Sequence, residues 1–197
     1  MKQEIKYIKP QDGFQQKFLS SKADIVFWWW AAWSWKTFAL LLEPLRHINN
    51  WKFWWVIFRR SSPQIRNEWG LWDNSMSLYP LVLWTPKESS LEWNFPSWAK
   101  IKFSQIEYEK DVLNFQGSQI PFIWFDELTH FSKKVFFYML WRNRSLCWVS
   151  PYVRATMNPD SDSWVKEFIS WYLDEDGYII KERDWVIRYF IQDWWNI

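Results

Sequence analysis

Short apolar runs alternate with segments of helical periodicity along the chain. The apolar runs predict strands at residues 23–27, 53–58, 122–125, 152–156 and 186–190. Apolar side chains at helical spacing predict helices at residues 36–48, 132–141 and 163–173, and the Ser-Ser-Pro sequence at residues 61–63 is typical of a helix start. Because strands and helices alternate, we expect an α/β fold in which helices flank a mostly parallel central sheet.

One pair of predicted strands has a short connection. Residues 91–95 and 100–103 alternate apolar and polar positions on either side of a Pro-Ser-Trp-Ala sequence, which predicts a β-hairpin inserted in the fold. The chain has 197 residues, enough for one domain with a sizeable core, and it contains no evident repeat or flexible linker. We therefore expect residues 1–197 to form a single domain.

Tryptophan is unusually frequent and glycine unusually rare. The chain has 21 Trp and 4 Gly, whereas glycine makes up about 7% of ordinary chains. Trp69 and Trp98 stand at turn positions, where positive φ or close backbone approach normally requires glycine. We interpret most of these residues as glycines encoded by UGA and read with a genetic code that assigns UGA to tryptophan. Four others stand in ordinary tryptophan contexts: Trp72, Trp93, Trp164 and Trp171. The alternative is a genuinely tryptophan-rich protein.

The segment between the first strand and the first helix can carry chemistry. Replacing Trp30, Trp33 and Trp35 by glycine turns residues 30–37 into a Walker A loop, G-x-x-x-x-G-K-[ST], which wraps phosphates with bare backbone N–H groups. Lys36 would then neutralise the β- and γ-phosphates of ATP, and Thr37 would bind Mg²⁺. With tryptophan at these positions the segment fits an aromatic core strand followed by a helix, and no ATP binding is expected.

Two polar clusters follow later strands. Asp126 and Glu127 end the apolar run 122–125, a Walker B pattern in which the aspartate serves the metal and the glutamate polarises the attacking water. Strand ends are often acidic, so this interpretation depends on the Walker A segment. Thr156 and Asn158 end the next strand, where a polar side chain could sense the γ-phosphate, although Asn-Pro also commonly begins a turn.

These motifs, in this order, resemble the large subunit of tailed-phage terminases. The resembling segments are residues 23–37, 56–60, 126–131, 142–145 and 154–159. The resemblance spans nearly the whole chain. It implies a RecA-like P-loop NTPase fold of the type with an additional strand and a catalytic glutamate, and an ATPase that drives double-stranded DNA into a procapsid.

The resemblance also assigns roles to individual residues. It implies an ATP-binding set of Gln15, Trp30, Ala31, Ala32, Trp33, Ser34, Trp35, Lys36 and Thr37, in which Gln15 contacts the adenine. Thr37 and Asp126 would hold Mg²⁺, Glu127 would be catalytic, and Thr156 and Asn158 would fall in the coupling motif. An arginine should stabilise transition-state charge. The sequence does not choose among four candidates: Arg59, Arg60, Arg142 and Arg144.

The family implies partners and a location as well. It implies double-stranded DNA contacted through its phosphates, a portal protein, a small terminase subunit, a ring of subunits and the host cytoplasm. The family's second domain is a nuclease. No acidic triad follows the motifs described above, so we do not expect DNA cleavage from residues 1–197.

Composition narrows the remaining alternatives. A net charge of +2 does not indicate a nucleic-acid coat, the single cysteine excludes an internal disulfide, and no apolar stretch is long enough for a membrane span. His130 lacks a second ligand at metal-binding spacing and is interpreted as structural. Two rivals remain open, namely another P-loop motor such as a helicase, and a non-enzymatic aromatic-rich interaction module.

Overall fold

Seven strands form one sheet in the part of the chain that the computed structural model describes, which is residues 9–29, 33–82, 85–158 and 160–191. The spatial order is β1 (Ile25–Trp29), β7 (Tyr152–Met157), β6 (Phe122–Phe125), β2 (Trp54–Arg59), β5 (Lys100–Gln105), β4 (Glu92–Asn94) and β3 (Thr85–Lys87). The first five strands in this order are parallel, and β4 and β3 are antiparallel to their neighbours. The expected mostly parallel α/β sheet is therefore confirmed.

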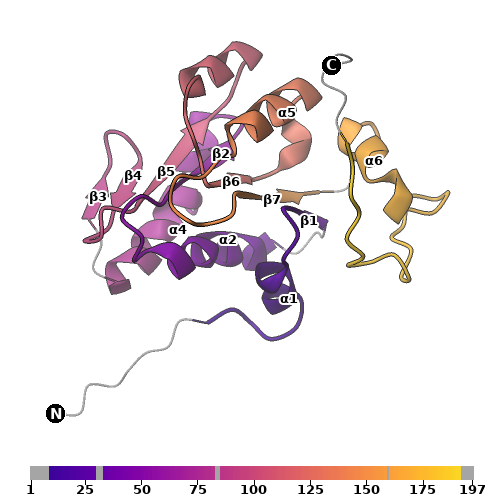
Figure 1. Cartoon of the computed structure of the whole chain (residues 1–197), viewed down its shortest axis with the longest axis horizontal. Helices are drawn as coiled ribbons and strands as arrows, with labels where there is room; N and C mark the ends of the chain where they lie inside the picture. Colours follow the sequence, from indigo (N-terminus) through magenta and orange to yellow (C-terminus); the bar gives the residue numbers. More distant parts are fainter. Residues whose placement is uncertain (1–8, 30–32, 83–84, 159, 192–197) are drawn as a thin grey trace.

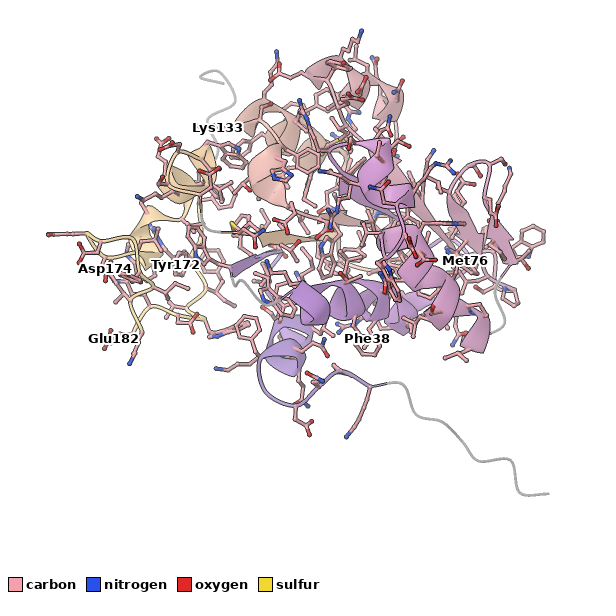
Figure 2. All side chains as sticks on the ribbon, turned by 180° about the vertical axis from the view of Figure 1, so that it is seen from behind. Phe38, Met76, Lys133, Tyr172, Asp174 and Glu182 are labelled. Carbon is pink, nitrogen blue, oxygen red and sulfur yellow. The ribbon has the colours of Figure 1, made fainter. Side chains whose placement is uncertain are left out.

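Helices cover both faces of this sheet (Figure 1). One side carries α1 (Phe14–Ser20), α2 (Trp33–Leu42), η1 (Glu43–His47), α4 (Leu71–Leu78) and η2 (Tyr79–Val82). The other side carries η3 (Glu109–Phe115), η4 (Leu128–His130), α5 (Lys133–Arg142), α6 (Trp164–Phe168) and η5 (Ser170–Tyr172). The short α3 (Ser62–Arg66) follows β2. Seen from behind, Phe38 of α2 and Lys133 of α5 lie on opposite sides of the sheet (Figure 2).

The two cores follow from alternation along the buried strands. In β2, Trp55 and Ile57 join the core under α2 and α4, whereas Val56 and Phe58 join the core under α5 and α6. A parallel strand covered by helices on both faces needs apolar side chains at every position. This is why β2 and β6 appear in the sequence as continuous apolar runs.

Most predicted elements are confirmed, with small shifts at their ends. The strands at 53–58, 122–125 and 152–156 correspond to β2, β6 and β7, and the hairpin corresponds to β4 and β5. Strand β7 lies between β1 and β6.

Two helices differ from the prediction. The helix predicted at 36–48 begins earlier, at Trp33, and ends at Leu42 before continuing as the 3-10 helix η1. Pro44 explains the change, because it lacks the N–H that an α-helical bond to Leu40 would use. The helix predicted at 163–173 divides into the short α6 and η5.

The strand predicted at residues 186–190 is wrong. Residues 186–191 have no regular secondary structure and belong to no strand of the described sheet. Their side chains are largely solvent-exposed, with Tyr189 at 94% and Ile191 at 98%. Apolar, β-branched composition favours a strand, but a strand forms only beside a partner, and this run pairs with none among the described residues. Among all the residues that the structure describes, no helix is both long and apolar enough to cross a bilayer.

Several tryptophans adopt backbone conformations that suit glycine. Of the six non-glycine residues with positive φ in the described part of the chain, four are Trp69 (64°), Trp98 (72°), Trp148 (64°) and Trp185 (63°). A side chain disfavours this left-handed region, and a bulky one is rare there.

Candidate active site at the carboxyl ends of the strands

The polar residues singled out from the sequence gather at one edge of the sheet. Strands β1, β7, β6 and β2 are parallel, so their carboxyl ends meet there, where open α/β sheets bind ligands. Lys36 lies near the start of α2, which follows β1, and Asp126 and Glu127 directly follow β6. Thr156 lies near the end of β7, with Asn158 just beyond it.

Lys36 is buried at this edge and bound to the end of β7. It is 5% exposed, and its Nζ donates to the backbone oxygen of Met157 and to Oδ1 of Asn158, each at 3.0 Å. Burial lowers the pKa of Lys36, while the nearby carboxylates of Glu127 and Asp126 act to raise it. The ammonium group thus donates two hydrogen bonds to neutral oxygens, and an anion could replace these partners.

Both carboxylate oxygens of Asp126 have partners. Oδ1 accepts a hydrogen bond from the hydroxyl of Thr156 at 2.5 Å. Oδ2 accepts from Nε of Arg59 and also forms an ion pair with its Nη2. The residue is 4% exposed, so these partners replace the water that a carboxylate would otherwise require.

Glu127 is held by the same strand through different contacts. Its backbone N–H donates to the Thr156 hydroxyl at 3.2 Å, and its Oε2 accepts from Nδ2 of Asn158 at 2.9 Å. Its φ of 60° and ψ of 62° are left-handed, a conformation that strains a residue with a side chain and is often found at functional sites. Thr156 therefore joins the two acidic residues, and Asn158 joins Glu127 to Lys36.

The Walker A segment is described only in part. Trp30, Ala31 and Ala32 lie outside the described residues. The first turn of α2 is formed by the backbone of Trp33, Ser34 and Trp35. Thr37 lies in the same helix beside Lys36 and is partly exposed. Gln15 is buried on α1, and its Oε1 accepts from the backbone N–H of Gln11 at 2.6 Å.

The four candidate arginines occupy different places. Arg59 ends β2 and contacts Asp126, while the neighbouring Arg60 acts electrostatically on Glu109. Arg142 lies at the opposite edge of the sheet, where its backbone oxygen accepts from Ile120 ahead of β6. Its guanidinium lies 5.1 Å from the Tyr138 ring centroid. Arg144 follows Arg142 in the connection to β7, so neither lies beside Lys36 in the same chain.

The oxygen donors at this edge suit a hard cation. Among the described residues, no three His, Cys, Asp or Glu side chains form a metal cage. Mg²⁺ in nucleotide sites usually needs only one or two protein ligands, with water and phosphate oxygens supplying the rest. The carboxylate of Asp126 and the hydroxyl of Thr37 are of the right chemical type.

The sequence pattern missed two arginine contacts. Arg59 could not be preferred over the other candidates because strand order, which places β2 beside β6, is a long-range property. Arg154 was noted only within a resembling segment. In the structure it is 2% exposed and donates to the backbone oxygens of Ser21 and Ala23, which tie β7 to the chain before β1. A charged residue inside an apolar strand was the available signal.

Comparison with known proteins gives a family match and several similar folds. The family described as terminase large subunit, T4likevirus-type, N-terminal, matches residues 34–196. No curated protein matches the chain. The large terminase of bacteriophage HK97 has a similar structure, with a TM-score of 0.64 and 14% identity over 92% of this chain and 43% of that chain.

Two further structures show the same fold. The ATPase domain of the Thermus phage P74-26 large terminase has a TM-score of 0.56 and 13% identity, over 87% of this chain and 78% of that one. The bacteriophage Phi-29 genome packaging motor assembly has a TM-score of 0.55 and 13% identity, over 79% of this chain and 50% of that one. The chain thus spans less than half the length of the HK97 protein and half that of the Phi-29 chain.

Proposed function

Because the chain belongs to the terminase large-subunit family, T4-like type, we propose that it is the ATP-hydrolysing motor domain that moves double-stranded DNA into a procapsid. The observation that carries this proposal is the hydrogen-bonded chain from Lys36 through Asn158 to Glu127, beside Asp126 and Thr156. It brings together the residue types that phosphoryl transfer to water requires, at the edge where parallel sheets bind nucleotides.

Each residue has a distinct part in the proposed reaction. Lys36 exchanges its two oxygen partners for the β- and γ-phosphates of ATP, assisted by the N-terminal end of α2. Glu127, oriented by its bond from Asn158, accepts a hydrogen bond from the attacking water and polarises it. Mg²⁺, when bound, would be held by Asp126 and Thr37 and would neutralise charge on the phosphates.

Asn158 and Thr156 would couple hydrolysis to movement. Asn158 contacts Lys36 through its amide oxygen and Glu127 through its amide nitrogen, so it responds to a change at either. Thr156 contacts Asp126 and the backbone of Glu127 from the adjacent strand. Loss of the γ-phosphate would therefore shift the end of β7, and we propose that this shift is passed on to DNA.

We also propose that glycine is the natural residue at most tryptophan positions. The positive φ of Trp69, Trp98 and Trp148 supports this. So do the indole N–H groups of Trp55 and Trp124, which are buried without a hydrogen-bond partner among the described residues. By contrast, two tryptophans that we interpret as genuine have such a partner: Trp93 donates to Ser75 at 2.9 Å and Trp164 to Phe131 at 2.7 Å. Glycine at residues 30, 33 and 35 would allow the loop to wrap a triphosphate.

The proposed partners follow from the family and from the motor assemblies that share the fold. They are double-stranded DNA, a portal protein, a small terminase subunit and further copies of this chain in a ring, acting in the host cytoplasm. Arg142 and Arg144 lie away from Lys36 in their own chain, so any role for them at an ATP site would be in a neighbouring subunit. Arg60 remains a candidate for stabilising transition-state charge at the ATP site of its own chain.

Steady-state ATP hydrolysis tests the proposal. The Trp30→Gly, Trp33→Gly, Trp35→Gly variant should hydrolyse ATP, with stimulation by DNA and portal protein, and adding Lys36→Ala should abolish the activity. Lys17→Ala is the matched control, because Lys17 is an exposed lysine on α1, and it should leave the rate unchanged. Absence of Lys36-dependent hydrolysis, even with DNA and portal protein, would favour a non-enzymatic interaction module. A helicase would instead unwind DNA without needing a portal.

A further inference from the structure

The ion pair between Arg59 and Asp126 engages the carboxylate that the proposed function assigns to Mg²⁺. Both Nε and Nη2 of Arg59 approach Oδ2 of Asp126, and the Thr156 hydroxyl takes Oδ1. A cation coordinated by Oδ2 would use the oxygen that now accepts from Arg59, so Arg59 and the metal compete for it.

Resting on the function proposed above, we propose that Arg59 is a displaceable counter-ion of Asp126, which holds the carboxylate in place until a divalent cation arrives and then releases it. Burial makes the first role necessary, because a carboxylate that is 4% exposed needs a compensating charge. The position of the arginine makes release feasible. Its side chain is 23% exposed, whereas that of Asp126 is 5% exposed, so Arg59 can turn toward solvent while Asp126 stays.

The charge balance of the site supports the same exchange. Lys36 and Arg59 face Asp126 and Glu127, so the cluster has two cationic and two anionic side chains. A divalent cation added beside Lys36 and Arg59 would leave the cluster with more positive than negative charge, and departure of Arg59 restores part of the balance. Arg59 is thus a positioning residue for the metal carboxylate rather than a fixed transition-state group.

Metal binding without nucleotide tests this inference. Mn²⁺ titrations to millimolar concentration, followed by EPR of the free ion, should show about tenfold tighter binding for Arg59→Gln, which corresponds to about 1.4 kcal/mol of removed competition. Arg60→Gln is the matched control, because it removes the same charge from the next residue, and its affinity should stay within about twofold of the parent. Asp126→Asn should abolish the binding in every background.

The outcomes separate this inference from the proposed ATPase. Unchanged or weaker Mn²⁺ binding by Arg59→Gln overturns the inference, as does binding that survives Asp126→Asn or an equal gain from Arg60→Gln. If circular dichroism shows that Arg59→Gln is unfolded, Arg59→Lys decides the matter. It retains one charge without the two-nitrogen contact, and its affinity should rise by a smaller factor. An affinity for Arg59→Lys equal to that of the parent would contradict the exchange. No ATP is used, so a failed ATPase assay leaves this result unaffected.

Discussion

Replacing Trp98 by glycine should stabilise the protein. Trp98 has a φ of 72° in the connection between β4 and β5, and 83% of its surface is exposed. Its backbone N–H donates to Phe95 at 3.0 Å, a bond that the substitution preserves. The indole ring is mostly in water, so its removal sacrifices little buried apolar area.

The magnitude follows from the backbone. Left-handed φ and ψ cost a residue with a side chain about 1–2 kcal/mol. The greater freedom of unfolded glycine offsets up to about 1 kcal/mol of this. We expect a net gain of about 1 kcal/mol, or about 2–4 °C in Tm for a chain of this size. Trp69 and Trp148 are also exposed and left-handed, so the three substitutions together should raise Tm by about 6–12 °C if they act independently.

Thermal and urea unfolding of the single and triple variants measures this gain. Trp51 is the matched control, since it is 63% exposed and has no positive φ, so Trp51→Gly should leave stability unchanged or reduce it. Equal effects of Trp98→Gly and Trp51→Gly would refute the backbone argument. A loss of stability in the triple variant would do so as well.

Three further substitutions test other parts of the structure. Thr156→Val should reduce the free energy of unfolding in urea by about 1–3 kcal/mol, because it leaves Oδ1 of buried Asp126 without a donor while Oδ2 keeps Arg59. His47 has its pKa lowered from 6.5 to about 4 by burial and by Arg46, so below pH 6.5 the unfolded chain binds a proton that the folded chain does not. Through His47, the free energy of unfolding in urea should therefore fall by about 1–2 kcal/mol between pH 7 and pH 4. This figure is lower than the full pKa difference implies, because solvent screens the partly exposed side chain. Arg154→Met should destabilise the fold by about 3–5 kcal/mol by calorimetry, because it removes the buried charge near Glu43 and three hydrogen bonds to backbone oxygens.

Each of these predictions has a control. Thr156→Ser keeps the hydroxyl and should lose less stability than Thr156→Val. The His47→Gln variant should show a smaller drop in stability on acidification than the parent, and an identical pH profile would contradict the assignment. Arg144→Met removes an exposed arginine and should change stability by less than about 0.5 kcal/mol. An equally small effect of Arg154→Met would show that its buried contacts are unimportant.

Local pattern was sufficient for much of the fold. The buried parallel strands β2, β6 and β7 are short apolar runs because both of their faces meet helices, and such runs are visible without knowledge of their neighbours. The acidic pair and the Thr156–Asn158 segment could be placed near each other because they follow parallel strands. Pro44 could have predicted the end of α2, since the reason is local.

The features that could not be predicted from the sequence depend on pairing between segments far apart in the chain. The apolar segment 186–190 has strand composition, but only a neighbouring strand could make it one. The Arg59 contact with Asp126 depends on β2 lying beside β6. Arg142 is distant from the site because α5 ends near the start of β6, at the opposite edge of the sheet. No spacing along the chain encodes these arrangements, so the four arginines were indistinguishable from sequence.

The proposed chemistry can be tested most directly by separating ATP binding from ATP hydrolysis. In the variant carrying glycine at residues 30, 33 and 35, Glu127→Gln should bind ATP within about threefold of its parent, because Lys36 still neutralises the phosphates. Single-turnover hydrolysis should fall by about 10²–10⁴-fold, since the group that polarises water is lost. Hydrolysis that continues at the parental rate in Glu127→Gln would contradict the account.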